Sequence, residues 1–269
     1  VSHLVYHILQ KAVLRPIRHA QGRPEGFEGR QGSGHPRKQV FLGGNVKGIS
    51  TLAMLKDVKR GDFAVLELDS WQLQGFGERK LSPHMAIFTN FMPDHLNYYR
   101  GDMETYWRDK EHIFKYQKSK DHFITTQEMF RYIETFSKTK INGHVVFPKS
   151  ILKTWDVQLL GKHNGENIAL AVSAARALSI PDKIIKEVIE NFPGVSGRLE
   201  FLREIEGVKI YNDTTATTPD ATIAALKALG KSPSTRYARS GYNQNIVLIV
   251  GGADKGLDMT KLIKEIPKY

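Results

Sequence analysis

The chain contains 269 residues, of which 41% are hydrophobic and 25% are charged, as in an ordinary globular protein of one or two domains. Its net charge of +11 favours an anionic partner, but the basic residues are scattered and form no nucleic-acid-binding motif. The absence of cysteine excludes disulfides and thiolate metal sites and fits a reducing cytoplasm. No apolar run approaches the roughly 20 residues of a membrane helix. We therefore expect a cytoplasmic monomer whose partners are small molecules, with neither nucleic acid nor membrane among them.

An apolar stripe with helical spacing opens the chain, and it consists of Leu4, Val5, Ile8, Leu9 and Ala12. Because the stripe begins at once, with no capping residue or turn before it, we expect it to continue a structure upstream of Val1. Residues 15–39 are rich in Gly, Arg, Pro and His and contain almost nothing to bury. This segment is predicted to be a disordered insertion or linker.

Short apolar runs that end in polar residues, typical of buried parallel strands, occupy 63–68, 84–90, 208–213 and 245–252. Helical patterns occupy 103–117, 164–178, 182–192 and 219–229. Strands that alternate with helices predict an α/β, doubly wound fold with a mostly parallel sheet, which binds ligands beyond the carboxyl ends of its strands. The Pro-Gly turn at 193–194 predicts a boundary between a domain at 1–193 and a second domain at 194–269. We expect both domains to be incomplete at their outer ends.

Candidate metal ligands follow two of the predicted strands. Glu67 lies near the carboxyl end of its strand, where a carboxylate is costly to bury unless it is paired or binds a metal, although a solvent-facing position explains it as well. Asp69 and Ser70 add oxygen atoms of the kind that Mg²⁺ prefers. His95 follows the next strand beside Asp94, and it shares the sheet edge with Glu67 if the two strands are neighbours. A lone histidine in a loop is more often a surface residue.

Lys110 lies in the middle of an apolar helical stripe, whose other members are Met103, Tyr106, Ile113, Phe114 and Gln117. Burial there lowers the pKa of a lysine and leaves some neutral amine. A neutral amine reacts with carbon dioxide to give a carbamate, which offers anionic oxygen atoms to a metal. The alternative is that Lys110 extends its amine to the surface, which is the commoner fate of such lysines.

Further segments suit nucleotide or phosphate binding, although each is a weak signal alone. Asn164 and Asn167 lie one turn apart at the start of an apolar helix, where they can bond the edge of a heterocycle, and Asn164 can equally cap the helix. Arg198 follows the proposed boundary and can reach a phosphate. Asp213 ends a strand before a helix whose amino terminus favours anions. Lys255 lies on a turn after a predicted buried strand.

Eight segments resemble the Mur ligases, and they occur in family order: GGN at 43–45, LELDSWQL at 66–73, TNFMPDHL at 89–96, YWRDKEHIF at 106–114, GKHNGEN at 161–167, GRLE at 197–200, YNDTTAT at 211–217 and GGADKG at 251–256. Each segment alone is common, but the eight together are specific and cover nearly everything after Gln39. The resemblance is greatest to family members that join D-glutamate to UDP-N-acetylmuramoyl-L-alanine. It implies a central ATPase-like domain followed by a truncated Rossmann-like C-terminal domain.

The resemblance implies an ATP-dependent ligase of peptidoglycan synthesis, a process that supports cell-wall biogenesis, cell shape and cell division. ATP would phosphorylate the carboxylate of the UDP-linked muramoyl precursor, and the amine of D-glutamate would displace phosphate from this acyl phosphate. Glu67 would bind one Mg²⁺, while His95 and a carbamylated Lys110, the implied catalytic residues, would bind a second. The other implied contacts are adenine with Asn164 and Asn167, ribose with Asp213, phosphates with Arg198, the incoming amino acid with Thr217 and Lys255, and the muramoyl substrate with Asn45.

The chain also departs from the family pattern. The Gly-rich phosphate loop of the family should stand directly before a helix such as 2–11, and neither this loop nor the UDP-substrate domain lies within the chain, so we expect a fragment with impaired catalysis. Asp69, Thr215 and Gly197 stand where the family often has serine, lysine and histidine. The alternatives are another Mur ligase or a folylpolyglutamate synthase-like ligase, or a non-catalytic nucleotide-binding module. The last of these predicts that the candidate metal ligands do not meet in space.

Overall fold

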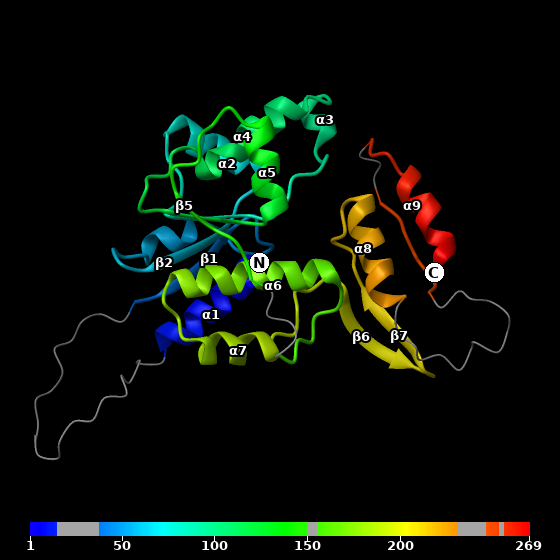
Figure 1. The fold of residues 1–269 in the computed structure, drawn as a ribbon. Coiled ribbons are helices and arrows are strands. Elements are labelled where there is room, and N and C mark those ends of the chain that lie inside the picture. Colours follow the sequence, from blue (N-terminus) through cyan, green and yellow to red (C-terminus); the bar gives the residue numbers. More distant parts are fainter. Residues whose placement is uncertain (15–37, 150–154, 231–245, 253–255) are drawn as a thin grey trace, which may run out of the picture.

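The computed structural model describes residues 1–14, 38–149, 155–230, 246–252 and 256–269 (Figure 1). Most of the predicted insertion at 15–39 lies outside the described residues, as does Lys255. Over the described ranges, none of the helices combines the length and the apolarity that a membrane crossing requires.

Short parallel strands form the centre of the first part of the chain. β1 (Val40–Gly44) is joined to β2 (Phe63–Glu67) through the 3₁₀ helix η1 (Ala53–Lys56), and the two strands pair in parallel. A second parallel sheet has the order β3 (Met85–Phe88), β4 (His122–Thr125), β5 (His144–Val146). The predicted α/β class and the strands at 63–68 and 84–90 are therefore confirmed.

The expectation of one continuous sheet is wrong. In the described part of the chain no hydrogen-bonded ladder joins β2 to β3, so the parallel strands form two sheets. The two sheets are nevertheless parts of one layer, because apolar side chains of β2 and β3 pack against the same buried cluster. Shared packing on one core, and not a shared ladder, therefore brings the ends of β2 and β3 together.

Helices cover both faces of this layer (Figure 1). On one face lie α1 (Ser2–Leu14), α6 (Lys162–Ala177) and α7 (Asp182–Glu190), whose buried side chains form the larger core. The apolar stripe predicted at the start of the chain is confirmed as the buried side of α1, since Leu4, Val5, Ile8 and Leu9 are all buried. The helices predicted at 164–178 and 182–192 are confirmed as α6 and α7, with ends that differ by two residues at most.

The other face is covered by α2 (Ser70–Glu78), α4 (Met103–Lys115) and α5 (Gln127–Phe136), and α3 (Leu96–Tyr99) is a single turn between β3 and α4. Aromatic side chains dominate the core on this face. α4 begins where Asp102 accepts hydrogen bonds from the backbone N–H groups of the first turn. This cap fixes the register of α4, and the register decides which of its side chains face the ends of the strands.

The part of the chain after α7 begins with an antiparallel hairpin of β6 (Glu200–Ile205) and β7 (Val208–Asn212). α8 (Pro219–Leu229), α9 (Thr260–Glu265) and the 3₁₀ helix η2 (Ile266–Lys268) follow. α8 has the predicted bounds, because Thr218 caps it and a proline occupies its first turn. The strand predicted at 208–213 is confirmed, but it is a partly exposed hairpin strand and not a buried parallel one, and β6 was not predicted.

The strand predicted at 245–252 is wrong for the residues that the structure describes. Residues 246–252 form neither helix nor strand, and the side chains of Val247 and Ile249 are each 91% exposed. A strand satisfies its backbone groups only through a neighbouring strand. Within the described ranges no strand pairs with this segment, so its apolar composition alone does not make it a strand.

Candidate active site

Lys110 lies on α4 close to three carboxylates. Burial lowers the pKa of Lys110, and the neighbouring Asp69, Asp94 and Glu67 oppose this shift without cancelling it. The Nζ atom lies 5.8 Å from the centre of the Tyr106 ring, within the range of a cation–π contact. The direction of the pKa shift agrees with the predicted desolvation, and the side chain is half-buried.

Glu67 is the last residue of β2, and its side chain is exposed at the carboxyl end of the strand. Its Oε2 atom accepts a hydrogen bond of 2.7 Å from the Ser2 hydroxyl, and its carbonyl accepts one of 2.6 Å from the Asn45 backbone N–H. A Cβ atom on Gly44 would lie only 2.0 Å from this carbonyl oxygen, so a glycine is needed where β1 ends against Glu67. The first residues of α1 and the end of β1 therefore meet Glu67 at one edge.

Asp69 caps α2. Its Oδ1 atom accepts a hydrogen bond of 2.8 Å from the Gln72 backbone N–H, and the Gln72 side-chain oxygen accepts one of 3.2 Å from the Asp69 N–H. This reciprocal pair is a capping box, and it places the cap of α2 two residues after β2 ends. Asp69 therefore has a structural role while it contributes negative charge beside Lys110.

His95 follows β3 in a tight turn, with a left-handed backbone at φ 55° and a hydrogen bond of 2.8 Å from its N–H to Asp94 Oδ1. Its ring packs edge-on against Trp71 of α2 at a centroid distance of 4.5 Å. The ring also lies 6.2 Å from that of Tyr106, which is the ring below the Lys110 amine. The Tyr106 ring therefore lies near both the His95 imidazole and the Lys110 amine.

The groups predicted to bind metal thus gather in one region of the structure. Glu67 and Asp94 act electrostatically on Lys110, and His95 shares the Tyr106 ring with it. In the described part of the chain, no three His, Asp or Glu side chains are arranged to hold a metal ion by themselves. The oxygen atoms of a carbamylated Lys110 would supply the further metal ligands that Glu67 and His95 lack. That role of Lys110 remains a prediction.

Asp109, which the sequence did not single out, joins the three elements that carry these groups. Its Oδ2 atom accepts hydrogen bonds from Gln74 Nε2 of α2 at 2.7 Å and from the Tyr99 hydroxyl of α3 at 2.8 Å. Tyr99 is buried, and burial raises the pKa of its hydroxyl well above the usual range. α2 follows Glu67, α3 follows His95, and α4 carries Lys110. One carboxylate therefore sets their mutual positions.

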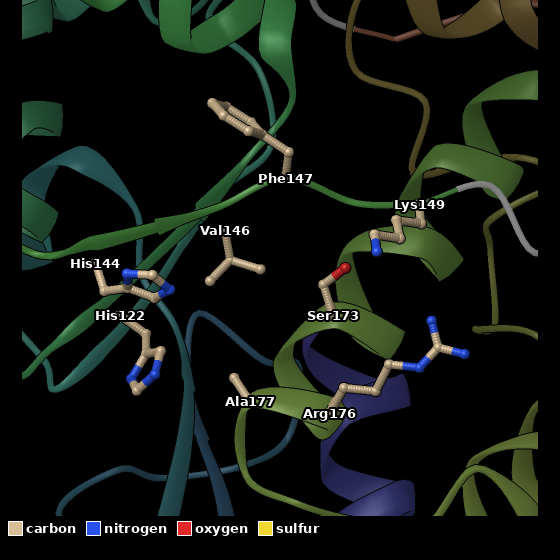
Figure 2. Close-up of a pocket in the computed structure, with 8 residues that line it drawn as sticks. All are labelled: His122, His144, Val146, Phe147, Lys149, Ser173, Arg176 and Ala177. Carbon is tan, nitrogen blue, oxygen red and sulfur yellow. The ribbon is translucent and has the colours of Figure 1, made fainter.

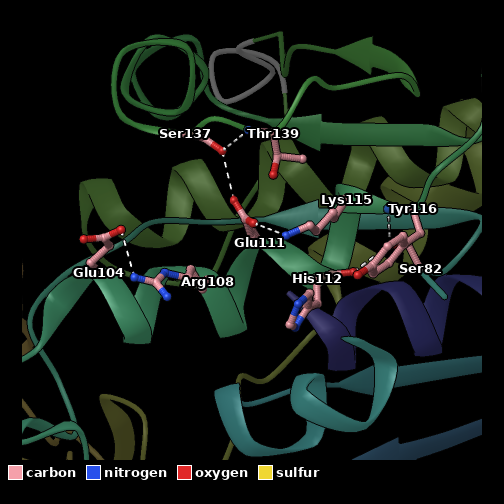
Figure 3. A network of polar contacts seen from close by, with 9 residues as sticks. All are labelled: Ser82, Glu104, Arg108, Glu111, His112, Lys115, Tyr116, Ser137 and Thr139. Carbon is pink, nitrogen blue, oxygen red and sulfur yellow. Dashed lines mark hydrogen bonds and ion pairs between the residues drawn. The ribbon is translucent and has the colours of Figure 1, made fainter. Parts of the chain in front are cut away.

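A second set of contacts fixes the rotation of α4 from its far side (Figure 3). Glu111 is buried and accepts hydrogen bonds from Lys115 Nζ at 2.6 Å and from Ser137 Oγ, at the end of α5, at 3.0 Å. The Ser82 hydroxyl donates to the His112 carbonyl at 2.6 Å. Because Glu111 is held toward α5, its neighbour Lys110 is turned toward the strand ends.

Arg198 and Asp213 both take part in the hydrogen bonds that join the start of β6 to the turn after β7. Asp213 Oδ1 accepts a hydrogen bond of 2.8 Å from the Leu199 N–H, and Arg198 Nη1 donates one of 2.5 Å to the Thr215 carbonyl. Asp213 also raises the pKa of His163, against the larger lowering effect of burial. The turn after β7 therefore lies close to the first turn of α6.

The remaining predicted contact residues surround this turn. Asn164 does not cap α6, which begins at Lys162; its Nδ2 atom donates a hydrogen bond of 2.8 Å to the Leu160 carbonyl. Asn167 is half-buried one turn further along α6, and Thr217 is exposed between β7 and α8. Asn45 lies elsewhere: it is exposed directly after β1, where its backbone N–H bonds the Glu67 carbonyl. The structure thus divides the predicted contacts between two places, the ends of β1 and β2 and the start of α6.

This arrangement defines the class of the protein: an α/β protein with a candidate ligand site beyond the carboxyl ends of parallel strands. The Mur ligase middle domain matches residues 1–151. The chain belongs to the Mur ligase family.

Curated relatives agree with this assignment. The chain is 34% identical over 258 residues to the UDP-N-acetylmuramoylalanine–D-glutamate ligase of Roseiflexus sp. (strain RS-1), covering 84% of this chain and 52% of the relative. It is 32% identical over 245 residues to the ligase of the same name from Clostridium tetani, covering 84% and 49%. The chain therefore spans about half the length of the curated relatives that it matches.

Two MurF structures share the fold. The MurF ligase of Thermotoga maritima in complex with ADP gives a TM-score of 0.55 at 17% identity and covers 84% of this chain and 55% of that chain. MurF from Acinetobacter baumannii gives a TM-score of 0.53 at 19% identity, covering 72% and 54%.

Proposed function

We propose that the chain is part of an ATP-dependent ligase of peptidoglycan synthesis, acting in the cytoplasm. It joins D-glutamate to UDP-N-acetylmuramoyl-L-alanine through an acyl phosphate. Relatives that carry the name of this ligase, at 31–34% identity, support the choice of substrates. The observation that carries the proposal is the desolvated Lys110 amine beside Glu67, Asp94 and the Tyr106 ring that it shares with His95.

The residues around Lys110 suit a magnesium site. The carboxylates of Glu67 and Asp94 are hard oxygen ligands of the kind that Mg²⁺ prefers, and His95 offers one nitrogen. The neutral amine of Lys110 attacks carbon dioxide to form an N–C bond, and it releases one proton as the carbamate forms. One Mg²⁺ held by Glu67 and a second held by His95 and the carbamate would stabilise negative charge on the transferred phosphoryl oxygen atoms.

The second group of residues suits the nucleotide and the substrates. Asn164 and Asn167 contact adenine from the start of α6, Asp213 contacts ribose from the adjacent turn, and Arg198 contacts the phosphates. The nearness of Asp213 to the start of α6 supports this assignment. Asn45 contacts the muramoyl substrate from the edge that it shares with Glu67. Thr217 and Lys255 receive the incoming amino acid.

These contacts divide between two domains, 1–193 and 194–269. The hydrogen bonds of Arg198 and Asp213 already belong to the hairpin turn, so nucleotide binding requires part of these contacts to rearrange.

The decisive assay is D-glutamate-dependent release of phosphate from ATP, measured with the chain in its full-length context. Lys110→Ala should abolish the release, and short carboxylic acids should restore part of it by replacing the carbamate. Lys118→Ala is the matched control, because Lys118 is an exposed lysine just beyond α4, and it should retain full activity. Phosphate release that depends on a different amino acid would show that the protein is another ligase of the family. Unchanged activity in Lys110→Ala would exclude the proposed role of the lysine.

A further inference from the structure

A cavity of about 410 Å³ lies between the outer side of β5 and the last turns of α6 (Figure 2). His122 and His144 line it from the amino ends of β4 and β5, whereas the candidate active site lies at the carboxyl ends of the strands. Arg176 lines it from α6, and the twelve residues that separate it from Asn164 correspond to about 18 Å along the helix. The cavity is therefore separate from the sites proposed for ATP and Mg²⁺.

The lining of this cavity is cationic. Two of the eight lining residues are cations, two are histidines and none is acidic: Lys149, Arg176, His122 and His144 are joined by Val146, Phe147, Ser173 and Ala177. Lys149 is exposed and forms no ion pair with any residue that the structure describes. Asp182 accepts hydrogen bonds from Nε and Nη2 of Arg176, at 2.8 and 2.7 Å. A guanidinium has five N–H donors, so three of them stay available.

The cavity also has an apolar floor between two charged ends. Figure 2 shows Val146 and Ala177 between the histidine pair and the cationic end with Lys149 and Arg176. The Ser173 hydroxyl donates to the Ala169 carbonyl at 2.8 Å, so it is engaged within α6. The volume lies within the range of sites for small molecules. We propose that this cavity binds a small organic oxyanion, with its phosphate or carboxylate group at Lys149 and Arg176 and its apolar body over Val146 and Ala177.

The charges decide between an anion and a metal ion. The rings of His122 and His144 lie edge to face with their centres 5.8 Å apart, and two imidazoles can bind a transition metal. Lys149 places a positive charge with no ion-pair partner among the described residues in the same cavity, which repels a cation and attracts an anion, whereas the charge of Arg176 is shared with Asp182. The donors of Arg and Lys match the oxygen atoms of phosphate and carboxylate alike.

The test uses phenyl phosphate, benzoate and inorganic phosphate, titrated into the chain and followed by NMR. Phenyl phosphate or benzoate should bind saturably, and the tighter of the two identifies the preferred oxyanion. Lys149→Gln should raise its Kd about tenfold, as expected for one lost charge-assisted contact. Lys209→Gln, which removes an exposed lysine of the distant β7, should leave the Kd unchanged. Circular dichroism shows whether each variant is folded.

Three results would overturn the inference. The first is an absence of saturable binding by both aromatic anions. The second is a Kd that responds to Arg198→Gln and not to Lys149→Gln, which would place the anion at the proposed nucleotide site. The third is binding of Ni²⁺, lost in His144→Gln, without any binding of anions. Inorganic phosphate that binds as tightly as phenyl phosphate would refute the role of the apolar floor. Loss of ligase activity in the proposed function would leave all of these titrations unaffected.

Discussion

At the scale of single residues, Lys110 is a charged group held where its charge is unfavourable, and its effect on stability depends on pH. Burial holds the pKa of the Lys110 amine below its ordinary value in the folded chain, whereas in the unfolded chain the amine has the ordinary pKa of 10.5. Between the lowered folded value and 10.5 the unfolded chain binds more protons, so the stability of the protein rises with pH across that window. At neutral pH the lysine therefore costs stability.

Lys110→Met should consequently raise the free energy of unfolding at pH 7, by about 1 kcal/mol. This gain in stability should be complete at pH values below the lowered pKa of Lys110. It should fade as the pH approaches 10.5, where both the folded and the unfolded chain lose the proton. Urea unfolding in buffer free of carbon dioxide, at pH 7 and pH 10, measures the effect. Lys118→Met, at an exposed position, should show neither the gain nor its pH dependence. A methionine variant less stable than the parent at pH 7 would contradict this account of Lys110.

Two Glu–Lys/Arg pairs with the same spacing on α4 differ strongly in burial, and their comparison tests the network in Figure 3. Glu111 pairs with Lys115 at side-chain exposures of 6% and 33%, and Glu104 pairs with Arg108 at 69% and 59%. Glu111→Ala should lower the free energy of unfolding by about 2 kcal/mol, because Lys115 and the Ser137 hydroxyl lose a buried partner. Glu104→Ala should cost about 0.5 kcal/mol or less. Equal costs in thermal or urea unfolding would show that the buried network does not hold α4.

At the scale of elements, Asp109 is predicted to hold α2, α3 and α4 together. Asp109→Ala should cost about 2 kcal/mol, because the buried Tyr99 hydroxyl and the Gln74 amide both lose their acceptor. Asp109→Asn should recover most of that stability, since both donors bond the same oxygen and an amide oxygen can accept both. If the ligase assay is active, Asp109→Ala should lower kcat more than its stability loss explains, whereas Asp109→Asn should not. If Asp109→Ala and Asp109→Asn lowered kcat equally, the result would argue against a positioning role for Asp109.

The elements that the sequence predicted well are those with local signals. α8 has its predicted bounds because Thr218 and Pro219 mark its start. α1 was predicted because the helical spacing of its apolar residues is visible in the sequence. β6 was not predicted because its side chains are almost all exposed, so no burial pattern marks it. The segment at 246–252 was predicted as a strand because composition does not say whether a partner strand is present.

At the scale of the whole molecule, the sequence predicted the family and the candidate groups, but not how they meet. The nearness of Glu67, His95 and Lys110 depends on two sheets that share one core and on the Tyr106 ring between two of these groups. Asp109 escaped notice because its partners, Gln74 and Tyr99, are 35 and 10 residues away in the chain. Long-range contacts of this kind leave no periodic pattern.

The exposure of residues 246–252 bears on how the second half of the molecule is organised, and it can be tested directly. Because Val247 and Ile249 are each 91% exposed, replacing both with threonine removes little buried surface. The double variant should change the free energy of unfolding by about 0.5 kcal/mol or less and should reduce self-association, because it interrupts an exposed apolar run. Ile124→Thr, in the fully buried centre of β4, should cost several times more, about 2–3 kcal/mol. Urea unfolding and light scattering measure the two effects. A cost for the double variant comparable with that of Ile124→Thr would mean that the segment is a buried strand in solution, as its sequence predicted.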